Sequence, residues 1–140
     1  MLLDANVLLY AMDTSDQRHE RAKVFLEDTL NGSIRVAIPW QVITAFLRIS
    51  TNARVYAEPL DAHTAWQFIW DCVGSSPAWI PPQTEDTALI LGELITDASV
   101  AGNLVSDAAL AAIAIEHGIP VVTNDTDFHR FPVQVINPFS

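Results

Sequence analysis

Four aspartates of this 140-residue chain each border a short apolar segment: Asp4, Asp107, Asp125 and Asp127. Carboxylates that gather at one place repel one another, so a group of them needs a compensating cation. Mg²⁺ prefers oxygen ligands and commonly uses one or two carboxylates together with a substrate phosphate. Such a site can activate water and neutralise a phosphodiester in its transition state. These residue types therefore indicate a metal site that acts on phosphodiester bonds.

The segments around these aspartates predict an α/β fold. Short apolar runs typical of strands occupy residues 2–3, 36–38, 78–80, 120–123 and 133–136. Segments typical of helices lie between them, at residues 5–12, 16–30, 40–49, 61–73, 84–98 and 107–117. This alternation of short strands with helices predicts a mainly parallel central sheet flanked by helices.

That topology would bring the four aspartates together. In open parallel sheets, sites form at the carboxyl ends of the strands. Asp4 follows the first predicted strand, and the pair Asp125 and Asp127 follows the strand 120–123. We expect Ser106 to cap a helix that begins at Asp107. If that helix starts at the same edge of the sheet, all four carboxylates converge.

Each aspartate taken alone has a simpler explanation. Asp107 is favoured in the first turn of a helix by the helix dipole. The segment 124–127 is typical of a polar turn. An EF-hand is disfavoured because no glycine and late glutamate follow at loop spacing. The metal site is therefore predicted from the four residues as a set.

Composition limits the classes of protein that the chain can be. Half of the residues are hydrophobic and 17% are charged, which predicts one folded domain over residues 1–140. Seven basic against 17 acidic residues give a net charge of −10, which argues against a broad basic surface for nucleic acid. An enzyme that reaches phosphate through bound cations stays possible.

The same sequence lacks the marks of a membrane or secreted protein. The longest apolar run has eight residues, whereas a membrane-spanning helix needs roughly 20. The amino terminus has no basic lead-in typical of a signal peptide. Cys72 is the only cysteine, so an internal disulfide and a cysteine-rich zinc site are excluded. We expect a cytoplasmic protein without a membrane segment.

Three segments resemble the motifs of PIN-domain nucleases, and most of all those of the VapC-type toxins of bacterial toxin–antitoxin pairs. The first is LLDANVLLY at residues 2–10, and the second is NLVSDAALAA at residues 103–112. The third is TNDTDF at residues 123–128, followed by Phe131 and Pro132. The three occur in order along the whole chain, as a PIN-like single domain requires.

The resemblance implies an activity and its partners. It implies an endoribonuclease that depends on Mg²⁺, with Mn²⁺ as a substitute, and that cuts RNA phosphodiester bonds. It also implies a homodimer that a cognate VapB-type antitoxin inhibits. Carried over residue by residue, the metal-binding acids match Asp4, Asp107 and Asp125, a fourth and more variable acid matches Asp127, and polar neighbours of the cluster match Asn6 and Thr123.

One departure from the family pattern concerns the third predicted helix. The family often has a glutamate there, whereas this chain has Ala45 before the stretch Phe46-Leu47-Arg48. The missing acid weakens the case for a second metal ion. It also keeps an alternative open, a catalytically weak or silent binding module that acts through its antitoxin partner. A metal-dependent cleavage assay on RNA separates the two.

Basic residues near the predicted site are candidate contacts for RNA phosphate. They are Arg48 and Arg54, which flank a polar turn, and Arg130, which follows the last acidic pair. The simpler reading is solvated charge at helix ends. A phosphoryl-accepting receiver domain is disfavoured because its lysine after the last strand is missing, and the only lysine is Lys23. A haloacid-dehalogenase-like phosphatase would have an aspartate where Asn6 stands.

Overall fold

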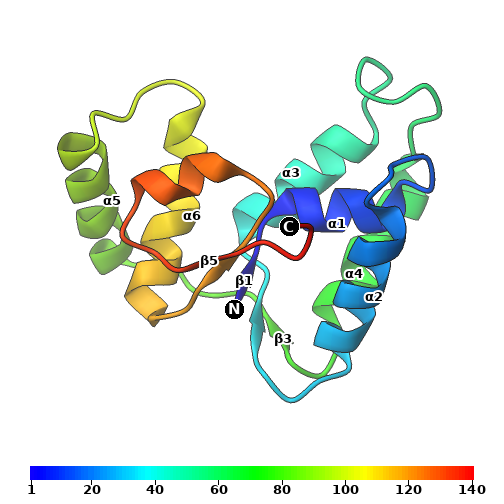
Figure 1. The fold of residues 1–140 in the computed structure, drawn as a ribbon, viewed down its shortest axis with the longest axis horizontal. Helices are drawn as coiled ribbons and strands as arrows, with labels where there is room; N and C mark the ends of the chain where they lie inside the picture. Colours follow the sequence, from blue (N-terminus) through cyan, green and yellow to red (C-terminus); the bar gives the residue numbers. More distant parts are fainter.

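The computed structural model describes residues 1–140 as a five-stranded parallel sheet with helices on both sides (Figure 1). The strands follow the spatial order β3-β2-β1-β4-β5, and all four neighbouring pairs are parallel. This confirms the predicted fold class. The strands are β1 Leu2–Leu3, β2 Val36–Ala37, β3 Ala78–Trp79, β4 Val121–Val122 and β5 Val135–Ile136.

Six α-helices and one 3₁₀-helix surround the sheet in two groups (Figure 1). Helices α1 to α4 contact one another, whereas α5 packs on α6 and α6 contacts the 3₁₀-helix η1. The helices are α1 Ala5–Met12, α2 His19–Leu30, α3 Trp40–Ser50, α4 Ala62–Val73, α5 Glu85–Asp97, α6 Leu104–His117 and η1 Thr126–Arg130. None of them is long and apolar enough to cross a membrane.

The core is continuous across both helical groups. Leu2 and Leu3 of the central strand are fully buried, because parallel strands are covered on both faces. Helix α6 is buried on most sides, and its residues 111–114 have no exposed surface. Its small alanines allow close approach to the sheet. Cys72 of α4 is buried too, and burial raises the pKa of its thiol to about 12, as suits a packing residue.

The pairing of β1 with β4 places the ends of two distant segments side by side. Leu2 pairs with Val121 and Leu3 with Val122, so Asp4 and Thr123 leave the sheet at the same edge. The backbone N–H of Asp4 extends the ladder by donating to the carbonyl of Val122 at 3.0 Å. The prediction that these two strands are neighbours is confirmed.

Two predicted helix starts were wrong. Helix α6 begins at Leu104, not at Asp107, and Ser106 lies within its first turn instead of capping it. The helix follows Gly102, whose φ of 62° is a left-handed conformation that glycine adopts readily. Helix α2 begins at His19 instead of Asp16, because the Asp16 carboxylate accepts from the backbone N–H and side chain of Arg18. That local turn competes with the helix.

Candidate metal centre

Three of the four predicted aspartates form a tight cluster at the carboxyl edge of the sheet. Asp107 comes from the first turn of α6, and Asp125 and Asp127 come from the start of η1. Carboxylate oxygens of the three lie within 4.8 Å of one another, and all three residues are half-buried. The backbone N–H of Asp127 donates to the side chain of Asp125 at 2.8 Å. Asp125 is therefore the N-cap of η1, and Asp127 lies in its first turn.

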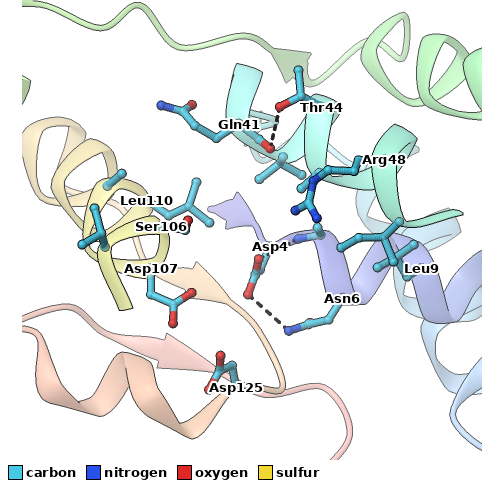
Figure 2. Close-up of a pocket in the computed structure, with 16 residues that line it drawn as sticks. Asp4, Asn6, Leu9, Gln41, Thr44, Arg48, Ser106, Asp107, Leu110 and Asp125 are labelled. Carbon is cyan, nitrogen blue, oxygen red and sulfur yellow. Dashed lines mark hydrogen bonds between the residues drawn. The ribbon is translucent and has the colours of Figure 1, made fainter. Parts of the chain in front are cut away.

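Asp4 lies at the same cleft but outside this tightest group. Its Oδ1 accepts from the backbone N–H of Ala5 at 2.7 Å, so it caps α1. Its Oδ2 accepts from the hydroxyl of Thr123 at 2.7 Å and from the side-chain amide of Asn6 at 3.2 Å. These bonds hold the carboxylate in one orientation, and Figure 2 shows it between Asp107 and Asn6.

Thr123 and Asn6, predicted as polar neighbours, connect the acids. The Thr123 hydroxyl is fully buried, donates to Asp4 and accepts from the backbone N–H of Asp125 at 3.0 Å. It also accepts from the side-chain amide of Asn6 at 3.0 Å. The side-chain Oδ1 of Asn6 accepts from the backbone N–H of Asn124 at 3.2 Å. One buried hydroxyl therefore positions both Asp4, which follows β1, and Asp125, which follows β4.

Two of the four acids, Asp4 and Asp107, have raised pKa values, and burial is the largest cause for both. Burial, as the largest cause, and then the charges of Asp125, Asp4 and Asp127 together raise the pKa of Asp107 to about 6. Burial also raises the pKa of Asp4, although hydrogen bonds from Thr123 and Ala5 oppose the shift. Arg130 is the one cation that forms an ion pair with these acids, and its Nε lies 3.7 Å from Asp127.

The acids open onto a cleft of about 540 Å³ between α1, α3 and α6 (Figure 2). The wall opposite the acids is one face of α3, which contributes Gln41, Thr44, Ala45 and Arg48. These positions have the spacing of a single helical face. Arg48 makes no ion pair and no side-chain hydrogen bond, and Figure 2 shows its guanidinium pointing into the cleft.

The comparison with known families decides the classification. The model of the family described as PIN domain matches residues 1–134. The chain belongs to the PIN-domain family. It is 36% identical over 130 residues to Ribonuclease VapC37 of Mycobacterium tuberculosis, which covers 93% of this chain and 90% of that protein. The same species' Ribonuclease VapC33 is 35% identical over 131 residues, 91% of this chain and 90% of that protein.

Solved structures show the same PIN fold at lower sequence identity. A chain of VapBC2 from Rickettsia felis, solved bound to a promoter DNA fragment, has a TM-score of 0.72 and 20% identity. The match covers 97% of this chain and 96% of that one. A chain of FitAcB from Neisseria gonorrhoeae has a TM-score of 0.66 and 20% identity, with 98% and 96% covered. These matches confirm the predicted PIN-like fold.

The donor set of this PIN domain fits a hard divalent cation. Asp107, Asp125 and Asp127 offer only oxygen ligands, the type that Mg²⁺ and Mn²⁺ prefer. Asp107 makes no hydrogen bond to a protein donor, and no cation forms an ion pair with it. PIN-domain nucleases generally depend on divalent metals, and the acidic cluster agrees with that property.

The other predicted positions divide between the cleft and its surroundings. Ala45 lies on the α3 wall. The position at which the family often has a glutamate therefore lines the same cleft as the acids. Arg48 lines the cleft, but Arg54 and Arg130 do not. Arg54 lies in the turn after α3, and Arg130 lies on η1 beside Asp127. Sequence reasoning missed Gln41, Thr44 and Ser106 as cleft residues, although the helical spacing of the α3 positions carried that information.

Proposed function

We propose that this PIN-domain chain is a metal-dependent endoribonuclease and the toxin of a toxin–antitoxin pair. The observation that carries the proposal is the meeting of three carboxylates within 4.8 Å at the edge of the sheet. Its relatives among the curated proteins are named VapC ribonucleases, at 32–36% identity over most of the chain. Two solved relatives are described as VapBC complexes from other bacteria.

The proposed metal is Mg²⁺, with Mn²⁺ as a substitute, held by Asp4, Asp107 and Asp125 with Asp127 beside them. When bound, such a metal neutralises phosphodiester charge and lowers the pKa of an attacking water. The carboxylates of Asp4, Asp107 and Asp125 can share the ion with waters, as Mg²⁺ sites commonly do. Asp4 is oriented for this role by the hydroxyl of Thr123 and the amide of Asn6.

The protein groups have separate roles in the proposed hydrolysis. Asp125 or Asp127 orients the attacking water and accepts its proton while the water oxygen bonds to phosphorus. The P–O bond to the leaving part of the RNA strand breaks, and the leaving oxygen keeps the bonding electrons and takes a proton from solvent. Arg48 stands on the opposite wall with no acidic partner. Its guanidinium can donate two hydrogen bonds to a phosphate oxygen pair and so position the strand. No nucleophilic side chain is required.

The proposed partners follow from the relatives. We infer that a VapB-type antitoxin inhibits this chain, because solved relatives of the same fold are described as toxin–antitoxin complexes. Self-association as a homodimer is a further prediction, and light scattering of the purified chain checks it. A small antitoxin co-purified with this chain should suppress cleavage of RNA.

The direct test is a cleavage assay with matched aspartate variants. Asp4→Asn and Asp107→Asn should each lower the cleavage rate at least about a hundredfold, the scale of losing a catalytic electrostatic partner. Asp97→Asn, at the exposed end of α5, should cleave as the parent does. If either site variant stays within a few-fold of the parent, that residue is removed from the proposed site.

The alternative is a catalytically weak or silent binding module. The observation that favours it is the α3 wall, which contributes no carboxylate to the cleft. In that case the parent would bind its antitoxin but cleave no RNA with Mg²⁺ or Mn²⁺ present.

A further inference from the structure

A second hollow lies beside the metal centre and is lined by hydrogen-bond donors. It has a volume of about 410 Å³ and is lined by Gln17, Arg18, Arg21, Asn124 and Phe139. No carboxylate lines it, although the chain carries 17 acidic residues against seven basic ones. Two guanidinium and two amide groups therefore face one small space. That chemistry suits an anion.

One residue connects the hollow to the cleft. Asn124 immediately precedes Asp125 of the acid cluster, and neighbouring Cα atoms are about 3.8 Å apart. Its backbone N–H donates to the side-chain Oδ1 of Asn6 at 3.2 Å, and Asn6 lines the cleft. Its side-chain amide lies 3.4 Å from the hydroxyl of Tyr10. Asn124 therefore lines the hollow while its sequence neighbour Asp125 lines the cleft.

The two arginines of the hollow are held in different ways. Arg18 donates from Nε and Nη2 to both oxygens of Asp16 at 2.9 and 2.8 Å, and its guanidinium lies 3.8 Å from the centre of the Tyr10 ring. It is therefore fixed in place. Arg21 donates to the carbonyl of Phe139 at 3.0 Å and pairs with no acid, so its positive charge is uncompensated.

The chain end completes the hollow. The ring of Phe139 packs edge-on against Tyr10, with centroids 5.3 Å apart. Figure 1 shows the C-terminus beside α1, which agrees with this contact. The backbone N–H of Phe139 donates to Asn137 at 2.9 Å, and the Asn137 amide donates to Asn124 at 3.2 Å. Residues from both ends of the sequence therefore build one wall.

We propose that this hollow binds a phosphate of the RNA strand next to the phosphate that the acid cluster cleaves. The inference rests on the proposed nuclease function and adds a second contact point to it. A chain of net charge −10 repels RNA on average, so local cationic sites must hold the strand near the acids. Arg21 supplies free charge, and Arg18 supplies N–H donors in a fixed position.

Arg35 provides a matched control. Like Arg18, its guanidinium lies over an aromatic ring, 4.4 Å from the centre of Trp79. Like Arg21, it is exposed and has no acidic partner. It precedes β2, however, and in a parallel sheet the amino ends of the strands lie opposite the edge that carries the acids.

The test measures binding of a labelled single-stranded RNA of mixed sequence to the Asp107→Asn protein by fluorescence anisotropy. On that background, Arg21→Gln and Arg18→Gln should each raise Kd roughly fivefold to tenfold at low salt, because each removes a phosphate contact. Each should also reduce the slope of log Kd against log salt concentration by about 0.7. Arg35→Gln should change Kd by less than about twofold.

Each other outcome has a definite meaning. If Arg21→Gln and Arg18→Gln bind as Arg35→Gln does, the hollow is not a phosphate site, whatever the parent cleaves. If the parent cleaves no RNA and the Asp107→Asn protein binds none, the nuclease function fails and the hollow fails with it. Arg18→Gln also breaks the Asp16 pair, so its thermal unfolding is measured. If it does not fold, the exposed Arg21→Gln variant decides.

Discussion

The hydroxyl of Thr123 donates to the carboxylate of Asp4 across 119 residues of sequence, at 2.7 Å. The same oxygen accepts from the backbone N–H of Asp125 and from the Asn6 amide. Because β1 and β4 pair directly, this one contact ties the acid of the first motif to the acid of the last. The buried hydroxyl is thus a positioning group for the proposed metal centre.

Replacing Thr123 by valine tests that role. Valine keeps the shape but leaves the Asn6 amide and the Asp125 N–H without their acceptor, which costs about 1–3 kcal/mol in a buried site. We expect Thr123→Val to lower both the melting temperature and the cleavage rate. Thr123→Ser keeps the hydroxyl and should retain cleavage. Equal cleavage by the valine and serine variants would show that the hydroxyl does not position the acids.

The pH dependence of stability tests the repulsion at Asp107. Its folded pKa of about 6 stands above the ordinary value of 3.8. Below the ordinary value the group is protonated in both states. As pH rises from about 4 to 6, the unfolded chain loses a proton that the native chain keeps, so stability falls across that window. In metal-free protein the loss should be on the order of 1 kcal/mol, since Asp107 is partly exposed to screening solvent.

The Asp107→Asn variant supplies the comparison. Its stability should fall less than that of the parent between pH 4 and 6, since Asp4 with its raised pKa remains, and thermal unfolding at a series of pH values measures the difference. At neutral pH, adding Mg²⁺ should raise the melting temperature of the parent more than that of the variant, because a ligand that binds only the native state stabilises it by mass action. An equal response to Mg²⁺ would identify Asp107 as a helix-terminus residue and not a ligand.

The α3 wall carries no carboxylate, so adding one there should strengthen metal binding. Ala45 faces the acids across the cleft, so Ala45→Glu adds a carboxylate to the site. We expect the variant to need a lower Mg²⁺ concentration for half-maximal cleavage, since an added carboxylate binds a hard cation. Ala45→Gln, which adds the same bulk without the charge, is the control. A requirement that is unchanged or higher in the glutamate variant would contradict this placement of the missing ligand.

Much of the site could be predicted because it depends on strand ends. Asp4 and Thr123 each follow a buried apolar run, and a parallel sheet brings such positions to one edge. The start of α6 could not be located in the same way. Ser106 and Asp107 are both residues that favour a helix terminus, whereas the real boundary depends on the left-handed Gly102. Asp107 still faces the acids because it stays within the first turn.

The hollow lined by hydrogen-bond donors could not be predicted from the sequence. It depends on the return of the chain end to α1 and on the contact between Phe139 and Tyr10. Arg18 and Arg21 alone are typical of solvated charge near a helix start, and no local pattern links them to Asn124. Only the pairing of segments more than a hundred residues apart brings these donors to one place.

Metal dependence of RNA cleavage is the most direct test of the central claim, that the clustered aspartates cut RNA with a bound divalent cation. Cleavage by the parent is followed in Mg²⁺, then after excess EDTA, then after Mg²⁺ is restored in excess over the chelator, with Asp107→Asn purified in parallel to reveal contaminating nuclease. We predict that cleavage stops with EDTA, resumes with Mg²⁺ and is almost absent in the variant. Cleavage that continues undiminished in EDTA, with the variant preparation silent, would contradict the metal mechanism.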